Sequence, residues 1–168
     1  MRVGLHGMVR RVWGRRGMKV RQLRQIVYEW RYLFLAVDGQ QGRLHWCWMP
    51  ALNALETRGV IRGLNKFTDL AGLVWDRAPA HTDKTVQELG MPLVSLPPYS
   101  PELNPAERIF EELRRKVEGI VYASLDAKVK AVTDELRRLD ASPDLVRSLT
   151  GWDWINNALD QPSLDYAA

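Results

Sequence analysis

The sequence has few of the features that mark secreted, membrane-spanning or low-complexity proteins. Its one cysteine, Cys47, cannot form an internal disulfide, which indicates a reducing compartment. The longest apolar run, Tyr32 to Val37, is much shorter than a bilayer span, and no apolar signal-peptide segment follows the first basic residue. We therefore expect one soluble, cytoplasmic domain of 168 residues without membrane contact.

Positive charge is concentrated at the start of the chain. Residues 1–31 hold nine Lys or Arg and one acid, a local charge of +8, whereas the whole chain carries +4. A basic segment interleaved with aromatic residues suits a polyanionic partner, although a solvated basic loop explains the charge equally well. The candidate contacts are Arg10, Arg11, Arg15, Arg16, Lys19 and Arg21.

Signals for strands and helices alternate along the sequence. Asp38 and Gly39 separate two runs rich in aromatic and β-favouring residues, which predicts a hairpin of 31–38 and 42–49 with Asp38 in its turn. Further strands are expected at 70–75 and 92–96, and helices at 52–64, 82–89, 104–119, 124–139 and 142–151. This alternation indicates an α/β fold.

Large apolar residues carry two further expectations. The apolar stripe between Leu125 and Leu139 should pack on the domain rather than form a dimer. Some tryptophans could stack on bases, but core packing is the stronger expectation for them. These are Trp46, Trp48, Trp152 and Trp154, and Trp75 is expected in the core as well.

Two acids stand where an open α/β sheet places its ligands. Asp76 ends one predicted strand, and Glu107 follows the next strand in the first turn of a helix that Asn104 can cap. Carboxylates brought together in this way bind Mg²⁺, and two such ions can activate a water or hydroxyl and stabilise a leaving oxygen. His81 would lie beside the same cleft.

Each of these residues also has an ordinary structural explanation. Glu107 can complete a capping box with Asn104, or complement the dipole of its helix. Asp76 can be a simple strand-end residue, and His81 a surface histidine. Spacing alone therefore leaves the function open.

Two motifs resemble the second and third acidic motifs of the IS630/Tc1/mariner transposases. They are Val74-Trp-Asp-Arg-Ala-Pro-Ala-His-Thr82 and Leu96-Pro-Pro-Tyr-Ser-Pro-Glu-Leu-Asn-Pro-Ala-Glu-Arg108. In that family Asp-Asn-Ala-Pro-x-His ends one strand, and Leu-Pro-Pro-Tyr-Ser-Pro-x-Leu-Asn-Pro-Ile-Glu opens the following helix. This sequence departs from the pattern at Arg77 and Ala106, and the resemblance runs from Met1 to about Leu139.

The resemblance implies an RNase H-like fold, with a mixed sheet flanked by helices and a helical C-terminal tail. It also implies a DDE set of carboxylates holding two Mg²⁺ ions, for which Mn²⁺ can substitute. Asp76 would be the second catalytic and metal-binding acid and Glu107 the third, with His81 lining the cleft and Asn104 in a supporting capping role. Such enzymes hydrolyse the phosphodiester at a transposon end and use the freed 3′-hydroxyl to attack target DNA.

Partners and domain limits follow from the same resemblance. We expect contacts with transposon-end and target DNA through the basic segment, a homodimer, and a nucleoid-associated cytoplasmic location. Residues 1–123 would form the catalytic core, and residues 124–168 a helical extension of the same domain.

The first acid of the family's set has no match in this sequence. By the resemblance of 2–5 and 12–14 it would lie just upstream of Met1, so the sheet is expected to lack its first central strand. We therefore expect the C-terminal catalytic part of such a transposase, from a misassigned start, a split gene or a decayed fragment. The alternatives are an inactive remnant that binds DNA non-specifically, with a steep salt dependence, and a fragment that does not fold alone.

Overall fold

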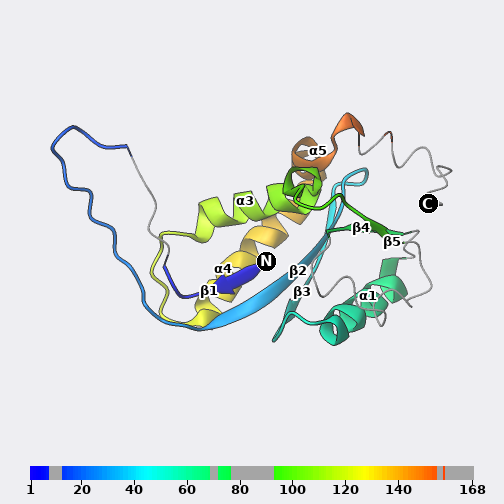
Figure 1. Ribbon diagram of the computed structural model, residues 1–168, viewed down its shortest axis with the longest axis horizontal. Coiled ribbons are helices and arrows are strands. Elements are labelled where there is room, and N and C mark those ends of the chain that lie inside the picture. The colour runs from blue at the N-terminus through cyan, green and yellow to red at the C-terminus, as the bar shows by residue number, and fades with distance from the viewer. Residues whose placement is uncertain (8–12, 69–71, 77–92, 155–156, 158–168) are drawn as a thin grey trace.

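The computed structural model describes residues 1–7, 13–68, 72–76, 93–154 and 157. Strands β1 (Arg2–Gly4), β2 (Trp30–Asp38) and β3 (Arg43–Met49) form an antiparallel sheet in that order, and β4 (Leu73–Trp75) pairs in parallel with β5 (Leu93–Ser95). The helices are α1 (Ala54–Thr68), α3 (Pro105–Val117), α4 (Leu125–Asp140) and α5 (Pro143–Thr150), with a 3-10 turn η2 (Pro101–Leu103). Helices α3, α4 and α5 lie on one side of the antiparallel sheet and α1 on the other (Figure 1).

The β2–β3 hairpin forms as the sequence predicts, and Asp38 closes its turn. Its Oδ1 accepts hydrogen bonds from the backbone N–H groups of Gln40 at 3.1 Å and Gln41 at 2.9 Å. Gly42 completes the turn with a φ of 67°, in the region that glycine adopts most readily. Asp38 therefore has the turn role expected of it.

The larger core lies between the antiparallel sheet and the three helices on its first side. Alternate residues of the two long strands face these helices, so Leu33 and Leu44 are buried there, and Trp46 and Trp48 pack against the same cluster. The completely buried apolar residues that the helices contribute to this core are Ile109, Leu113, Val132, Leu136, Leu139 and Val146. The apolar stripe of α4 therefore packs on the domain, as predicted.

Helix α1 covers the opposite face of the sheet and has a smaller cluster. Ile61 and Trp75 are buried in it, and Phe34 packs against them. The helix begins after Asn53, whose Oδ1 accepts a hydrogen bond from the backbone N–H of Glu56 at 2.9 Å. It extends four residues beyond the predicted end at residue 64, while the helix expected at 82–89 lies outside the described residues.

Core packing is the wrong expectation for Trp154, whose side chain is 42% exposed. Its ring instead lies 6.2 Å from the ring of Trp152, in the segment after α5. The guanidinium of Arg108 stands 5.4 Å from the Trp152 ring, so this pair is tied to the start of α3 at the surface.

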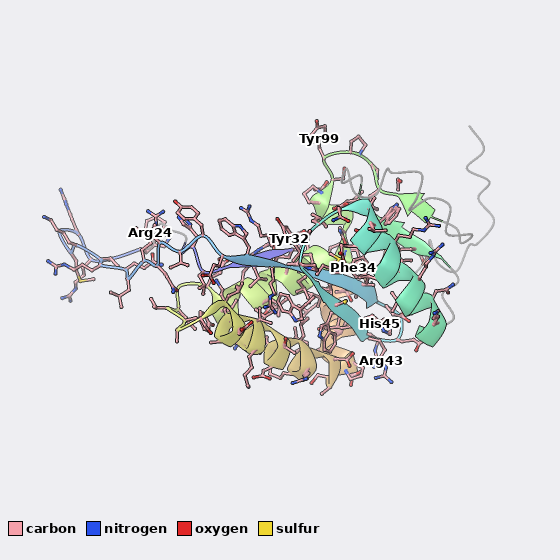
Figure 2. The ribbon with its side chains drawn as sticks, turned by 90° about the horizontal axis from the view of Figure 1, so that it is seen from below. Arg24, Tyr32, Phe34, Arg43, His45 and Tyr99 are labelled. Atoms are coloured by element: carbon pink, nitrogen blue, oxygen red, sulfur yellow. The ribbon has the colours of Figure 1, made fainter. Side chains whose placement is uncertain are left out.

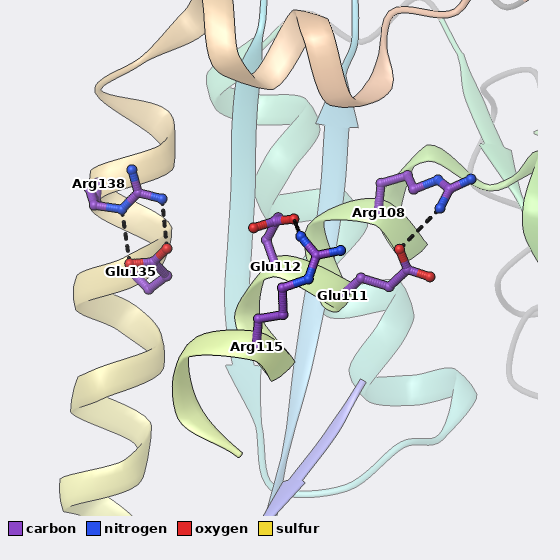
Figure 3. A network of polar contacts seen from close by, with 6 residues as sticks. All are labelled: Arg108, Glu111, Glu112, Arg115, Glu135 and Arg138. Carbon is purple, nitrogen blue, oxygen red and sulfur yellow. Dashed lines mark hydrogen bonds and ion pairs between the residues drawn. The ribbon is translucent and has the colours of Figure 1, made fainter. Parts of the chain in front are cut away.

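The outer faces of α3 and α4 carry ion pairs between residues one turn apart (Figure 3). Arg108 lies 3.1 Å from Glu111, Arg138 lies 2.7 Å from Glu135, and Arg115 pairs with Glu112. Each such pair stabilises a helix by only about 0.2–0.5 kcal/mol. In the part of the chain that the structure describes, no helix is long and apolar enough to cross a bilayer.

Candidate active site

Asp76 and the chain leading to Glu107 leave the parallel strand pair at the same edge. Trp75 lies opposite Ser95 in this pair, and the N–H of Leu96 donates a 2.8 Å hydrogen bond to the carbonyl of Trp75. Asp76 follows directly and is exposed. From Leu96 the chain passes through η2 into α3, whose first turn contains Glu107. This edge is where α/β sheets place their ligands.

The Met1 ammonium lies within the electrostatic influence of both acids. It donates a 2.6 Å hydrogen bond to the carbonyl of Leu33, where β1 begins beside β2. Burial lowers its pKa from the ordinary value, whereas the negative charges of Glu107 and Asp76 raise it and Arg114 lowers it. Both negative charges thus bear on the Met1 ammonium at the start of β1.

Asn104 fixes the start of the helix that carries Glu107. Its Oδ1 accepts a 3.0 Å hydrogen bond from the backbone N–H of Ala106, which confirms the predicted cap. The backbone N–H of Glu107 donates to the carbonyl of Asn104 at 3.0 Å. The capping box proposed as an alternative is not formed, because the N–H of Asn104 already donates to the carbonyl of Pro101.

The side chain of Glu107 is paired along its own helix. Its Oε2 lies 3.6 Å from Nη1 of Arg114, and the two side chains are 37% and 33% exposed. Sequence reasoning did not identify Arg114, although its position two turns after Glu107 places both residues on one helix face. Arg114 neutralises charge at the site and restrains the carboxylate.

Asp76 and Glu107 carry the oxygen ligands that hard divalent cations prefer. Mg²⁺ typically takes one or two protein carboxylates and fills its remaining positions with water and substrate phosphate. Both carboxylates are accessible to solvent, as such binding requires. Within the described ranges, no cluster of three or more His, Cys, Asp or Glu residues could hold a metal ion.

The remaining predicted site residues divide into two groups. His81, Arg10 and Arg11 lie outside the described residues. The other basic candidates are exposed on the extended segment 13–29, which reaches away from the packed body (Figure 1). They are Arg15, Arg16, Lys19 and Arg21.

The base of this extended segment is attached to the body. The side chain of Gln25 donates a 3.0 Å hydrogen bond to the carbonyl of Tyr122, and Gly7 N–H donates to the carbonyl of Gln25 at 2.9 Å. Apolar side chains are exposed along the segment as well: Trp13, Met18, Val20, Leu23, Ile26 and Tyr28. The segment thus presents basic and apolar side chains together to solvent.

The connection between β5 and α3 contains a conformation that sequence reasoning did not identify. Tyr99 has a φ of 58° and a fully exposed side chain that projects from the body (Figure 2). The prolines around it predict a rigid turn, but no sequence signal assigns a positive φ to a tyrosine.

Comparison with known proteins identifies relatives of the fold. The family model described as DDE superfamily endonuclease matches residues 1–127, and no curated protein matches the sequence. The Mos1 transposase paired-end complex with left transposon end is similar with a TM-score of 0.65 and 15% identity, over 90% of this chain and 49% of that chain. The Mos1 Strand Transfer Complex gives a TM-score of 0.68 and 15% identity, over 90% and 48%.

This chain therefore spans about half the length of the Mos1 chains that it resembles. At this identity the likeness concerns the fold, which is the RNase H-like α/β fold of transposase catalytic cores. The predicted fold class is confirmed.

Proposed function

Since this chain belongs to the DDE superfamily endonucleases, we propose that it is the C-terminal catalytic part of an IS630-family transposase. Its reaction would be metal-dependent cleavage of a DNA strand at a transposon end, followed by transfer of that strand to target DNA. One observation carries the proposal: Asp76 and the chain leading to Glu107 leave the β4–β5 pair at the same end, where α/β sheets place their ligands.

The proposed roles follow from the surroundings of each residue. Asp76 and Glu107 would hold Mg²⁺ or Mn²⁺, which when bound activates the attacking oxygen and stabilises the leaving oxygen. Asn104 fixes the first turn of α3, and Arg114 lies beside the carboxylate of Glu107 that would bind the cation. His81 keeps the cleft-lining role that the motif gives it.

The domain limits and partners are part of the same proposal. Residues 1–123 would form the catalytic core, with 124–168 as an extension of the same domain. The burial of Leu136 and Leu139 in the core that α3 shares supports a single domain. The exposed basic segment would contact the phosphates of transposon-end and target DNA in a homodimer located at the nucleoid.

Cleavage of a labelled transposon-end duplex by the purified 168-residue chain in Mg²⁺ or Mn²⁺ tests the assignment. Asp76→Asn and Glu107→Gln should each abolish cleavage while leaving the melting temperature nearly unchanged, because both side chains are exposed or half-exposed. Glu111→Gln is the matched control, since Glu111 lies one turn further along α3 in an exposed ion pair with Arg108. Cleavage that survives both acid substitutions would contradict the site.

The exposed basic segment supports a second candidate, an inactive remnant that binds DNA non-specifically. Binding would then need no metal and would be unaffected by Asp76→Asn. Neutralising one basic side chain that binds a phosphate should reduce the slope of log affinity against log salt by about one. Such a reduction on replacing Arg15, Arg16, Lys19 or Arg21 singly by Gln, with cleavage absent from the unsubstituted chain, would identify this function.

A further inference from the structure

Tyr99 occupies a backbone conformation that large side chains rarely adopt. Among the described residues it is the only non-glycine residue with a positive φ, and the other such positions are held by Gly17, Gly42 and Gly119. Core packing does not explain why a tyrosine occupies this position, because the Tyr99 side chain is fully exposed. Glycine or asparagine would fit this turn with less strain, so the fold itself does not require a tyrosine.

The chain on either side of Tyr99 is fixed by hydrogen bonds. Before it, the N–H of Leu96 donates a 2.8 Å hydrogen bond to the carbonyl of Trp75, the residue next to Asp76. After it, Asn104 N–H donates to the carbonyl of Pro101 at 3.0 Å and the Asn104 side chain caps α3. Three prolines restrict the backbone between these points. The ring is thus presented to solvent from the connection that leads from β5 to α3 and Glu107 (Figure 2).

Backbone strain that packing does not require is characteristic of functional sites. An aromatic ring held in this way suits one ligand chemistry in particular, the flat face of a nucleobase, on which aromatic side chains stack irrespective of sequence. We propose that Tyr99 stacks on an unpaired nucleobase adjoining the phosphodiester on which Asp76 and Glu107 act. This inference rests on the proposed function, because it assigns a DNA contact of the same site.

The base must be unpaired, because bases inside a duplex already stack on both faces. A DNA end with a single-stranded overhang presents such a base, as does a nucleotide taken out of the stack. The inference therefore predicts a difference between two probes that share a duplex: one blunt, and one with a 3′ overhang. The first unpaired position of the second probe is 2-aminopurine, whose fluorescence falls when it stacks.

Binding of both probes to the whole chain, with Ca²⁺ in place of Mg²⁺, gives the test. Tyr99→Asn should weaken binding of the overhang probe by about 5- to 150-fold and abolish the fluorescence change, without altering binding of the blunt probe. Tyr99→Phe keeps the ring and should behave as the unsubstituted chain. Trp13→Asn is the matched control, since Trp13 is equally exposed but lies on the extended segment, and it should not change the difference between the probes.

Melting temperature separates this function from a structural role. Tyr99→Asn should melt at the same temperature as the unsubstituted chain or higher, because asparagine accepts the positive φ more readily. A lowered melting temperature with unchanged preference for the overhang would show a structural role and overturn the inference.

The remaining outcomes distinguish this inference from the proposed function. If the unsubstituted chain cleaves transposon-end DNA in Mg²⁺ while Tyr99→Asn binds both probes as the unsubstituted chain does, the stacking role alone is wrong. If the unsubstituted chain neither cleaves nor binds either probe, the proposed function and the stacking role are both wrong.

Discussion

The Nζ of Lys128 donates a 2.7 Å hydrogen bond to the carbonyl of Gly4, which joins helix α4 to strand β1 across 124 positions of sequence. Lys128 is only 9% exposed, and its ammonium lies 5.8 Å from the centre of the Tyr122 ring. Burial lowers the pKa of Lys128, whereas the negative charge of Glu118 raises it. The Gly4 carbonyl, the Tyr122 ring and the charge of Glu118 thus offset part of the desolvation cost of this buried ammonium.

Removing this side chain should destabilise the attachment of α4 to β1. We expect Lys128→Ala to lower the free energy of unfolding by about 1–3 kcal/mol, because the Gly4 carbonyl loses a charged donor. Lys128→Met keeps the aliphatic stem and removes the desolvation cost of the charge, so its loss should be smaller. Urea denaturation measures the free energy of unfolding of both variants, with Lys130→Ala as the control at an exposed lysine of the same helix. Equal losses at positions 128 and 130 would contradict the burial argument.

The lowered pKa of Lys128 predicts a pH dependence of stability. Between that pKa and the unfolded value of about 10.4, the unfolded chain binds more protons, so stability contributed by this group rises with pH. Below the lowered pKa, both states carry the charge and the full desolvation cost applies. Burial raises the pKa of Tyr122, which opposes this trend above about pH 10. The free energy of unfolding is measured against pH, below about pH 10, for the unsubstituted chain and for Lys128→Met. The difference between the two curves is the contribution of Lys128, and a difference that does not change with pH would contradict the prediction.

The caps of α3 and α4 offer a matched pair of substitutions. Asn104 Oδ1 accepts from Ala106 N–H at 3.0 Å, and Ser124 Oγ accepts from Ala127 N–H at 3.1 Å. Replacing either residue by Ala should lower the free energy of unfolding by about 1 kcal/mol. Only Asn104→Ala should also reduce DNA cleavage, because it loosens the turn that positions Glu107. Equal cleavage by the two variants would show that this cap does not position the site.

Two glycines should respond to alanine with opposite signs. At Gly42, where φ is 67°, an added Cβ would lie 2.2 Å from the carbonyl oxygen of Pro143, so Gly42→Ala should cost about 2–5 kcal/mol. At Gly59, inside α1, an added Cβ meets nothing within 4 Å, and Gly59→Ala should stabilise the protein by about 0.5–1 kcal/mol. Thermal or urea unfolding measures the stability change of each variant. A stabilised Gly42→Ala variant would refute the described contact between the hairpin and α5.

Features that depend on neighbouring residues were predictable from the sequence. The hairpin around Asp38 and the caps at Asn104 and Ser124 require only a short polar side chain two or three residues from a free N–H group. The apolar stripe of α4 was predictable for a similar reason, since helical spacing gathers its residues on one face. The resemblance supplied Asp76 and Glu107, and spacing alone did not exclude their ordinary roles.

Features that depend on distant partners were not predictable. Strand β1 has three residues and is stabilised by pairing with a strand that begins at Trp30. Nothing in the sequence near Lys128 indicates that Gly4 is its acceptor. Trp154 was expected in the core because of its size, yet the fold leaves it at the surface beside Trp152. Tyr99 was missed because residue propensity assigns a positive φ to glycine or asparagine.

Glu107 lies on the long helix α3, whereas Asp76 follows the short β4–β5 strand pair. This difference determines which of the two elements unfolds first and so removes its acid from the site. Glu107 stands on a helix that buries Ile109 and Leu113 completely, so unfolding this helix requires separation of the main core. Asp76 follows a strand of three residues whose partner also has three. Hydrogen exchange should therefore be slower at the Leu113 amide inside α3 than at the Leu96 amide, which bonds the Trp75 carbonyl. The site should be lost first by opening of the β4–β5 pair while α3 remains folded.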